Sequence, residues 1–337
     1  MIVRLCAATL GLCLLHGAMV QAQDVFDSAQ SLGRGINVLG YDPLWSDPAK
    51  ARFTPELFKV IAAGGFQTVR VNLQAFAHMD AHDRLDPQWL HSLDAVVQQA
   101  SAAGLKVILD EHDFHPCAQN AETCRSRLLA FWGQVAVRFR DAPGTVLFEA
   151  LNEPSGKLTV AKWNALLAEV LATIRQSNPQ RGVIVGPAKG NYFTALPDLQ
   201  LPDTDRHLIV TLHYYNPFSF THQGAPWTRA DIRDQHDVHW GDQASRSKLY
   251  HEFDVIADWA RAHDRPVLLG EFGAYEAAPT ADRLAWTIAV VNAAEKRHFA
   301  WAYWQFEGSF GAYDLAQGHW NEAIHKALVA SDGAWKR

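Results

Sequence analysis

The stretch TVLFEALNEP, residues 145–154, decides how this chain folds. It starts as an apolar strand pattern and ends on an asparagine, a glutamate and a proline. Proline has no backbone N–H to donate, so strand pairing stops there. The strand therefore presents a carboxylate at its C-terminal end, and the rest of the chain repeats this plan with other polar side chains.

Short apolar runs rich in β-forming residues recur eight times, and amphipathic helical patterns separate most of them. Eight strands that alternate with helices predict a fold of the α/β class, a single (β/α)8 TIM barrel. The helix signal is weakest between the fifth and sixth strands. The predicted strands are 35–39, 68–73, 106–110, 145–151, 182–185, 207–212, 266–270 and 299–303, and the predicted helices are 55–63, 87–103, 126–139, 160–175, 248–262, 281–296 and 321–329.

Polar or aromatic side chains lie at the C-terminal ends of most of these strands. In a TIM barrel the C-terminal ends of the strands carry the active site. Side chains alternate along a strand, so Val267, Leu269 and Glu271 are expected to share the interior face. By the same argument Glu149 is a second, buried acid with a structural role beneath Glu153. The side chains at the strand ends are Arg70, Asn72, Asp110, His112, Asn152, Glu153, His213, Tyr215, Glu271 and Trp304.

Two of these side chains, Glu153 and Glu271, can face each other across the barrel mouth. Retaining glycoside hydrolysis needs such a pair, about 5–5.5 Å apart, with one carboxylate as nucleophile and the other as acid and base. The two roles need different pKa values, and a carboxylate beside Arg70 and the Tyr215 hydroxyl would be held ionised. Taken singly, either glutamate is more often a helix cap or a solvated strand end.

Other chemistries have weaker support. The pairs His112 with His115 and His236 with His239 have spacings that fit zinc. Metal-dependent hydrolase barrels place two histidines at the end of the first strand, where this chain reads GINVL. The chain has no Gly-x-Ser-x-Gly nucleophile elbow, and its Gly33-Arg34-Gly35 precedes a strand instead of opening a helix. The sequence therefore predicts neither a metal nor a cofactor.

The N-terminal residues carry one basic residue, an apolar run and then a small-x-small motif at Val20-Gln21-Ala22. This pattern predicts a secretory signal in residues 1–22 that is cleaved near Ala22, and export to the periplasm or the medium. A membrane anchor is the alternative, but the run is short for a span of about 20 residues. Residues 23–337 are expected to form one catalytic barrel with no appended carbohydrate-binding module, since no linker or low-complexity tract divides them.

Cleavage would leave Cys117 and Cys124 as the cysteines of an exported protein, for which a disulfide is the expectation. Residues seven apart on one helix lie about 10.5 Å apart along its axis, so this disulfide requires a loop. Removal of Arg4 changes the net charge from −6 to 29 − 36 = −7. Such a surface gives no reason to expect nucleic acid or an anionic membrane as a partner.

Over residues 30–330, the chain resembles glycoside hydrolase family 5, the cellulase family of the clan A barrels. The resemblance rests on Leu151-Asn152-Glu153-Pro154, on Gly270-Glu271-Phe272-Gly273 and on His213-Tyr214-Tyr215, together with Arg70, His112 and Trp304. It implies that Glu153 is the acid/base and Glu271 the nucleophile. Arg70 and Tyr215 would orient Glu271.

The resemblance also implies a set of substrate contacts. Asn152 would bind the 2-hydroxyl, His112 and His213 would position substrate and acid/base, and Trp304 would form the floor of the −1 subsite. The chain is most similar to bacterial endoglucanases of broad β-1,4-glucan and mannan specificity, but Asp113 stands where that group usually has a second histidine. The residues assigned to substrate binding are Asn37, Asp113, His222, Trp227 and Trp304.

The expected function is that of a retaining endo-β-1,4-glucanase which binds a β-linked polysaccharide or oligosaccharide and acts as a monomer. A β-mannanase, or an enzyme that accepts both backbones, is the nearest alternative. A barrel that binds polysaccharide without cleaving it is the alternative from another class, and the joint presence of both glutamates, Arg70 and Tyr215 argues against it.

Overall fold

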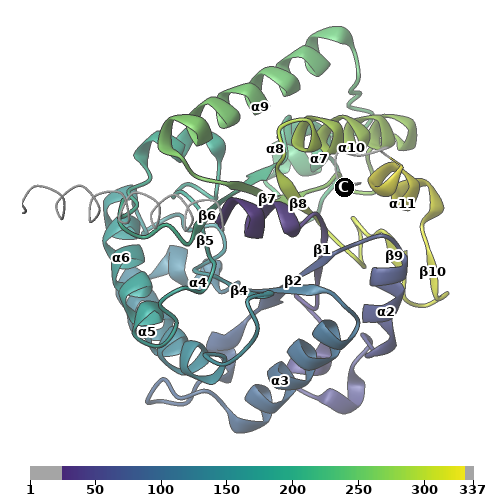
Figure 1. The fold of residues 1–337 in the computed structure, drawn as a ribbon. Coiled ribbons are helices and arrows are strands. Elements are labelled where there is room, and N and C mark those ends of the chain that lie inside the picture. The colour runs from purple at the N-terminus through teal and green to yellow at the C-terminus, as the bar shows by residue number, and fades with distance from the viewer. Residues whose placement is uncertain (1–24, 331–337) are drawn as a thin grey trace, which may run out of the picture.

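The computed structural model describes residues 25–330, whose eight parallel strands close into a barrel in sequence order (Figure 1). β1 pairs with β2 on one side and with β8 on the other, which closes the sheet. This confirms the predicted (β/α)8 barrel. The strands are β1 Arg34–Val38, β2 Thr68–Leu73, β3 Lys106–Glu111, β4 Val146–Glu149, β5 Val183–Val185, β6 Leu208–Tyr214, β7 Val267–Phe272 and β8 Ala300–Tyr303.

An outer ring of helices covers the barrel, one or more after most strands (Figure 1). The unit after β5 has only the 3-10 helix η4 (Phe193–Asp198), at the position where the sequence has its weakest helix signal. The long helices are α2 Glu56–Ala63, α3 Pro87–Ala102, α5 Ala121–Arg138, α6 Val160–Ser177, α9 Gln243–His263, α10 Thr280–Glu295 and α11 Glu322–Val329.

Short elements lie in the loops. They are the 3-10 helices η1 Pro43–Trp45, η2 Pro48–Lys50 and η3 Ala75–His78, the helices α4 Phe114–Gln119, α7 Phe218–Thr221 and α8 Ala230–Arg233, and an antiparallel pair, β9 Tyr313–Asp314 with β10 His319–Trp320. Most of them follow the carboxyl ends of barrel strands, so they build the face where a TIM barrel carries its site.

The barrel interior has an apolar lower half and a polar upper half. Val25, Ala29 and Leu32 pack beneath the barrel, and the short purple helix in Figure 1 carries the first of them. Arg70 and Glu149 lie higher and are also fully buried. The apolar interior layer consists of Ile108, Leu147, Ile184, Ile209, Leu268 and Ala300.

β7 departs from simple alternation. Leu268, and not Leu269 as predicted, belongs to the interior layer, while Leu269 packs in the outer core. Leu212 pairs with Leu269 but His213 pairs with Glu271, so Gly270 is an extra residue in β7. A bulge of this kind reverses the side-chain phase along a strand. Glu271 therefore points into the barrel, as predicted. The interior residue below it, however, is Leu268 and not Leu269.

The predicted disulfide between Cys117 and Cys124 is present, with a Cα–Cα distance of 4.6 Å. The prediction that the segment is a loop is wrong, because Cys117 lies in α4 and Cys124 in the first turn of α5. Asn120 interrupts the helix with extended dihedral angles and caps α5 through its side chain. This break turns the chain enough for the two cysteines to meet.

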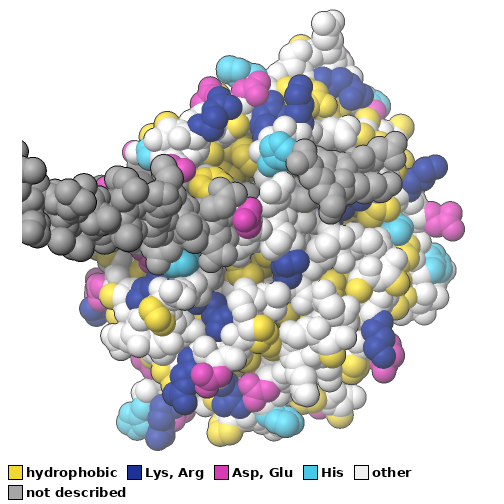
Figure 2. All heavy atoms as spheres, viewed as in Figure 1, with side chains coloured by type: hydrophobic (Ala, Val, Ile, Leu, Met, Phe, Trp, Pro, Cys, Tyr) yellow, Lys and Arg dark blue, Asp and Glu magenta, His cyan; other side chains and the backbone are white. Residues whose placement is uncertain are grey.

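Over residues 25–330, no helix combines the length and the apolar character that crossing a membrane requires. Charged side chains of both signs are interspersed on the face in Figure 2. The predicted secretory signal, residues 1–22, lies outside the described residues.

Candidate active site

A cavity of about 1140 Å³, here called the mouth cavity, lies at the carboxyl ends of the barrel strands. It brings together both predicted catalytic glutamates, Glu153 and Glu271, from β4 and β7. The other predicted site residues in its lining are His112, Asn152, Tyr215, His222, Trp227 and Trp304.

Glu271 lies at the bottom of the mouth cavity and is only 4% exposed. Its two carboxylate oxygens accept hydrogen bonds from separate donors, Oε1 from Arg70 at 2.7 Å and Oε2 from the Tyr215 hydroxyl at 2.9 Å. Hydrogen bonds in which the donor is charged are short and strong, and the guanidinium of Arg70 is such a donor. The site therefore holds the Glu271 carboxyl group in one orientation by both of its oxygens.

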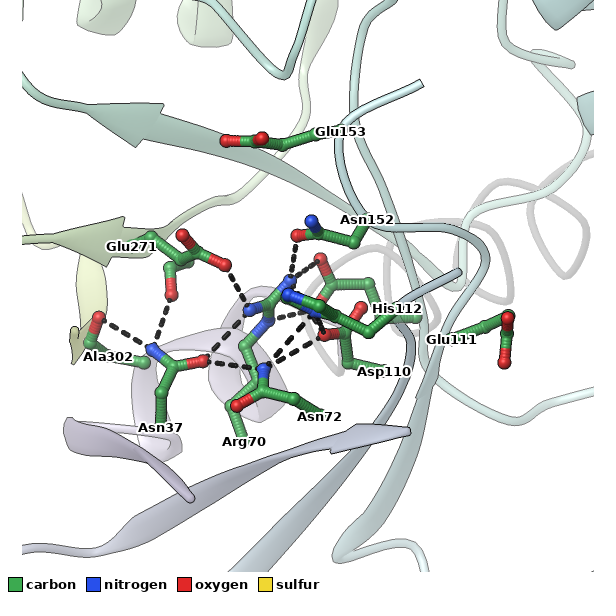
Figure 3. Close-up of polar contacts among 12 residues, drawn as sticks. Asn37, Arg70, Asn72, Asp110, Glu111, His112, Asn152, Glu153, Glu271 and Ala302 are labelled. Atoms are coloured by element: carbon green, nitrogen blue, oxygen red, sulfur yellow. Dashed lines mark hydrogen bonds and ion pairs between the residues drawn. The ribbon is translucent and has the colours of Figure 1, made fainter. Parts of the chain in front are cut away.

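Arg70 connects Glu271 to a buried polar network (Figure 3). Its guanidinium forms a two-point ion pair with Glu149 at 2.7 and 2.9 Å and a further ion pair with Asp110 at 3.1 Å. Glu149 is fully buried beneath the site, as the alternation of β4 predicts. Burial raises the pKa of Glu149 to about 7 against the opposing effect of Arg70. A guanidinium with partners on several sides cannot rotate, so it orients Glu271 precisely enough for attack on a bound atom.

Glu153 has a different environment. Its side chain is 27% exposed, and Oε1 lies 2.8 Å from Nδ1 of His213. Burial raises the pKa of Glu153 to about 7, although His112 and Arg70 act in the opposite direction. The carboxyl group therefore keeps its proton close to neutral pH, as a general acid must.

The backbone of Glu153 is left-handed, with φ of 41°. Such a conformation costs about 1–3 kcal/mol for a residue other than glycine and persists only where the surroundings hold it. The strained position lies one residue before Pro154, which also restricts the preceding residue. Strain at this point turns the Glu153 side chain toward the cavity after β4 has ended.

His213 lies between the two glutamates, with Nδ1 at 2.8 Å from Glu153 and 3.5 Å from Glu271. Burial lowers the pKa of His213 to about 4, so the ring is neutral. Nε2 lies 3.4 Å from the Asn191 amide nitrogen, which can only donate, so we assign the ring proton to Nδ1. His213 then donates to Glu153 and fixes the direction of its carboxyl group.

His112 forms the opposite wall of the site. Its Nδ1 lies 2.5 Å from Asp110, and its ring stacks on Trp304 with a centroid distance of 5.7 Å and an interplanar angle of 5°. Burial opposes the charged form, but the Asp110 carboxylate raises the pKa of His112 above its usual value. The stack gives the cavity a flat wall that ends in the half-buried indole of Trp304, which suits the apolar face of a sugar ring.

Two predicted substrate contacts, Asn37 and Asp113, are not in the lining of the mouth cavity. Asn37 is fully buried below the cavity, where its amide donates to three carbonyls and its Oδ1 accepts from Arg70 at 2.8 Å. Asp113 does not line the cavity, and its carboxylate accepts from the Phe76 backbone N–H at 2.7 Å. The hydrogen-bond partners of both side chains are groups of the protein itself.

Several cavity-lining residues were not predicted. Tyr41 is 60% exposed and lies in the loop after β1, and the short helix α4 contributes Phe114 and His115. Their only sequence signal is an aromatic residue shortly after a predicted strand, which is too common to be selective. The remaining unpredicted lining residues are Phe218, Thr228, Arg229, Ile232, Gln305, Gly308, Ser309 and Phe310.

Among residues 25–330, Glu153, His213 and Glu271 form the one group of three that could hold a metal ion, with ligand atoms within 4.8 Å of one another. The histidine pairs considered from the sequence, at 112 and 115 and at 236 and 239, form no such group in this part of the chain. The three residues are the same side chains that acid–base and nucleophilic chemistry would use.

A barrel with two glutamates that follow β4 and β7, one of them held by an arginine and a tyrosine, is an arrangement typical of glycoside hydrolases. The family model "Cellulase (glycosyl hydrolase family 5)" matches residues 29–309. The chain belongs to this family.

Solved structures of relatives cover the whole barrel. Endoglucanase Cel5A from the hyperthermophilic Thermotoga maritima is 37% identical, with a TM-score of 0.86 over 90% of this chain and 99% of that chain. Structures of that protein in complex with mannotriose and with cellobiose match equally well.

Curated relatives are longer than this chain. Endoglucanase H of Acetivibrio thermocellus is 29% identical over 301 residues, which are 87% of this chain and 31% of that protein. Endoglucanase 3 of Fibrobacter succinogenes is 27% identical over 354 residues, which are 88% of this chain and 52% of that protein. The chain thus spans about a third to a half of these relatives.

Proposed function

We propose that this protein is a retaining, endo-acting glycoside hydrolase that cleaves β-1,4-glucan backbones. The observation that carries the proposal is the contrast between the two glutamates, which each place one carboxylate oxygen within 4.8 Å of an oxygen of the other. Retaining enzymes have their carboxyl groups about 5–5.5 Å apart, whereas inverting enzymes leave about 6.5–9.5 Å for a water molecule. The short distance between these two oxygens supports the retaining mechanism.

In the first step Glu271 attacks the anomeric carbon while Glu153 protonates the departing glycosidic oxygen. The bond between the sugar and the leaving oxygen breaks, and a covalent glycosyl ester with Glu271 forms. Arg70 and Tyr215 hold the Glu271 carboxylate in position for this attack by hydrogen bonds of 2.7 and 2.9 Å. The raised pKa of Glu153, about 7 through burial, keeps the acid proton available.

In the second step Glu153, now ionised, takes a proton from water as that water attacks the anomeric carbon. The ester bond breaks, Glu271 becomes a carboxylate again and the product keeps the β configuration. Neutral His213 orients Glu153 in both steps, because its Nδ1–H donates to Oε1 at 2.8 Å. Asn152, whose Oδ1 accepts from Arg70 at 2.9 Å, is oriented to bind the 2-hydroxyl of the sugar.

The exposed aromatic side chains around the mouth cavity support binding of an extended sugar chain. Tyr41 and Trp227 are each 60% exposed and come from the loops after β1 and β6. Trp227 lies against Tyr275 and Phe310, with centroids 5.1 and 6.2 Å away, so its ring is held in place. Aromatic platforms on separate loops suit a polymer that passes across the cavity, which is the requirement for endo cleavage.

Incubation of the purified protein with cellopentaose, followed by ¹H NMR of the first products, tests this proposal. The β-anomer should appear first and then mutarotate. Initial formation of the α-anomer would contradict the retaining mechanism, and absence of any cleavage would contradict the proposed activity.

A dual glucanase and mannanase is the second candidate, because the Thermotoga maritima relative has been crystallised with both cellobiose and mannotriose. Glucose and mannose differ in the configuration at C2, the position that Asn152 would contact. Comparison of kcat/KM on cellopentaose and mannopentaose separates the candidates, since a strict glucanase would show no mannan cleavage.

We also propose that the mature protein begins after Ala22, is exported to the periplasm or the medium and acts as a monomer. The disulfide between two buried cysteines supports export, since such bonds form in oxidising compartments. Mass spectrometry of the protein from cell fractions tests the cleavage site, and light scattering tests the oligomeric state.

A further inference from the structure

The short helix α4, Phe114–Gln119, lies beside the loop that carries Glu153. It has six residues and contains Pro116, so it cannot persist through its own hydrogen bonds. The disulfide from Cys117 joins it to Cys124 in the long helix α5, and both cysteines are buried. The position of α4 is therefore fixed by a covalent bond to a helix of the outer ring.

α4 contacts the loop after Glu153 at close range. The carbonyl of Ala118 accepts a hydrogen bond from the Lys157 N–H at 2.8 Å. Gly156 packs against the same carbonyl so closely that a Cβ at this position would lie 2.6 Å from the oxygen. Gly156 also has φ of 61°, which side-chain-bearing residues rarely adopt. The contact thus needs both a glycine and a fixed α4.

This loop is also held by contacts other than α4, among them the buried side chain of Leu158. From Glu153 to the start of α6 at Val160 no residue lies in a helix or a strand. The carbonyl of Pro154 accepts a further hydrogen bond, from the Gly190 N–H at 3.1 Å. The strained, left-handed backbone of Glu153 needs a rigid environment to persist, and α4 supplies part of it from one side.

α4 also reaches the cavity itself. Phe114 and His115 line the mouth cavity, and the Phe114 ring meets the edge of the His112 ring at 5.4 Å. One short helix therefore contacts the loop that carries Glu153 and presents two side chains to the mouth cavity.

We infer that the disulfide-linked helix α4 positions Glu153 for acid–base catalysis, and that Cys117, Cys124 and Gly156 are positioning residues for the reaction. This inference rests on the proposed function. It assigns the disulfide a role in one half of the mechanism, protonation of the leaving group, and none in attack by Glu271, which Arg70 and Tyr215 hold from β2 and β6.

The test uses two β-cellobiosides that differ in how much they need an acid. A 2,4-dinitrophenyl leaving group departs without a proton, whereas a 4-methoxyphenyl leaving group needs one. The value of kcat/KM reports the first step, so Cys117→Ala/Cys124→Ala should lower it about tenfold for the methoxyphenyl substrate, a part of the ~10²–10⁴-fold that a positioned acid contributes. For the dinitrophenyl substrate it should stay within about twofold of wild type.

Gly156→Ala tests the same contact with the disulfide intact and should give the same pattern. Gly104→Ala is its matched control, because Gly104 has φ of 81°, follows α3 at the other end of the barrel and has no atom within 4 Å of the position that a Cβ would take. Gly104→Ala adds the backbone strain without the contact. The ratio of its kcat/KM values on the two substrates should therefore equal that of wild type. Thermal unfolding of each variant identifies a general loss of structure.

Equal losses on both substrates, or no loss in either the cysteine variant or Gly156→Ala, would overturn the inference. If the double cysteine variant does not fold, Gly156→Ala alone decides. A wild-type protein that cleaves neither cellobioside would instead overturn the proposed function, so the two failures are distinguishable.

Discussion

The ends of β4 and β7 each deliver a glutamate to the same cavity, and they do so by different means. β7 keeps its strand geometry and turns Glu271 inward with one extra residue, Gly270, whereas β4 ends and turns Glu153 with a left-handed backbone. Glu271 receives two hydrogen bonds from Arg70 and Tyr215, while Glu153 contacts His213 and is more exposed. Identical side chains thus have different hydrogen-bond partners and different exposure, and the proposed roles of nucleophile and acid follow this difference.

The largest effect is expected at β7. Glu271→Ala should lower kcat on cello-oligosaccharides on the order of 10⁴-fold or more, because it removes the atom that forms the covalent intermediate. Added azide should restore turnover by attacking from the vacated side, which gives an α-glycosyl azide. NMR of that product checks the assignment, and wild-type turnover by Glu271→Ala would exclude Glu271 as the nucleophile.

Glu153→Ala should have a smaller and substrate-dependent effect. Loss of the general acid is expected to cost about 10²–10⁴-fold in kcat/KM on cellopentaose and far less on 2,4-dinitrophenyl cellobioside. Azide should here attack the intermediate on Glu271 from the opposite face and give a β-glycosyl azide. An α-azide from Glu153→Ala would mean that the roles of the two glutamates are exchanged.

The bulge in β7 can be tested on its own. A Cβ at Gly270 would lie 2.4 Å from Thr211 Oγ1, so Gly270→Ala should displace Glu271, lower kcat about 10²-fold and reduce the free energy of unfolding by about 1–3 kcal/mol. Thr211 Oγ1 is buried without a hydrogen-bond partner, so Thr211→Ala should be nearly neutral. The double variant should recover much of the lost kcat, and its failure to do so would mean that the hydroxyl is not the obstacle.

Patterns local to one strand predicted the barrel, the polar strand ends and the burial of Glu149, because alternation and strand count depend on nearby residues. The bulge at Gly270 was not predictable in this way, since it is a shift in the pairing of β7 with the neighbouring strand β6, which the pattern of β7 alone does not contain. Asn37 and Asp113 were assigned to substrate for a similar reason. Sequence places a polar residue at a strand end but does not tell whether its partners are protein groups or a ligand.

The cysteine pair teaches the same point at a longer range. On one continuous helix Cys117 and Cys124 would be too far apart along the axis to form a disulfide, so the bond was expected only if the segment were a loop. A single extended residue, Asn120, separates two helices instead. A one-residue break leaves the helical propensity of its neighbours unchanged and depends on a side-chain cap, so the average pattern of the segment conceals it.

Burial raises the pKa of Glu153 to about 7. We therefore expect kcat/KM, plotted against pH, to fall on the alkaline side of this value. The acid must be protonated, so kcat/KM on 4-methoxyphenyl cellobioside should fall about tenfold between pH 6 and pH 8. The 2,4-dinitrophenyl substrate, which needs no proton, should show no such fall. An equal fall for both substrates would assign it to another group, such as His112.

The smallest effect on activity is expected for a change at Glu111, the last residue of β3. The pKa of this acid is raised, but its side chain is not part of the candidate active site. Glu111 is fully buried and points away from the other labelled side chains (Figure 3). Burial raises its pKa well above the usual range, and the nearby Asp113 carboxylate adds to the effect. Because Glu111 does not line the mouth cavity, Glu111→Gln should leave kcat/KM within about twofold of wild type.

Its effect should appear in the free energy of unfolding. The unfolded chain loses this proton above about pH 4.3 while the folded chain keeps it, so stability should fall by up to about 1.4 kcal/mol per pH unit as pH rises toward the folded pKa. Glutamine resembles the protonated acid and removes this proton from the balance. Urea unfolding at pH 5 and pH 8 should therefore show a smaller loss of stability for Glu111→Gln than for wild type. An equal loss would mean that Glu111 is ionised in the fold, and a large loss of activity would mean that the raised pKa at β3 serves the reaction as that of Glu153 does at β4.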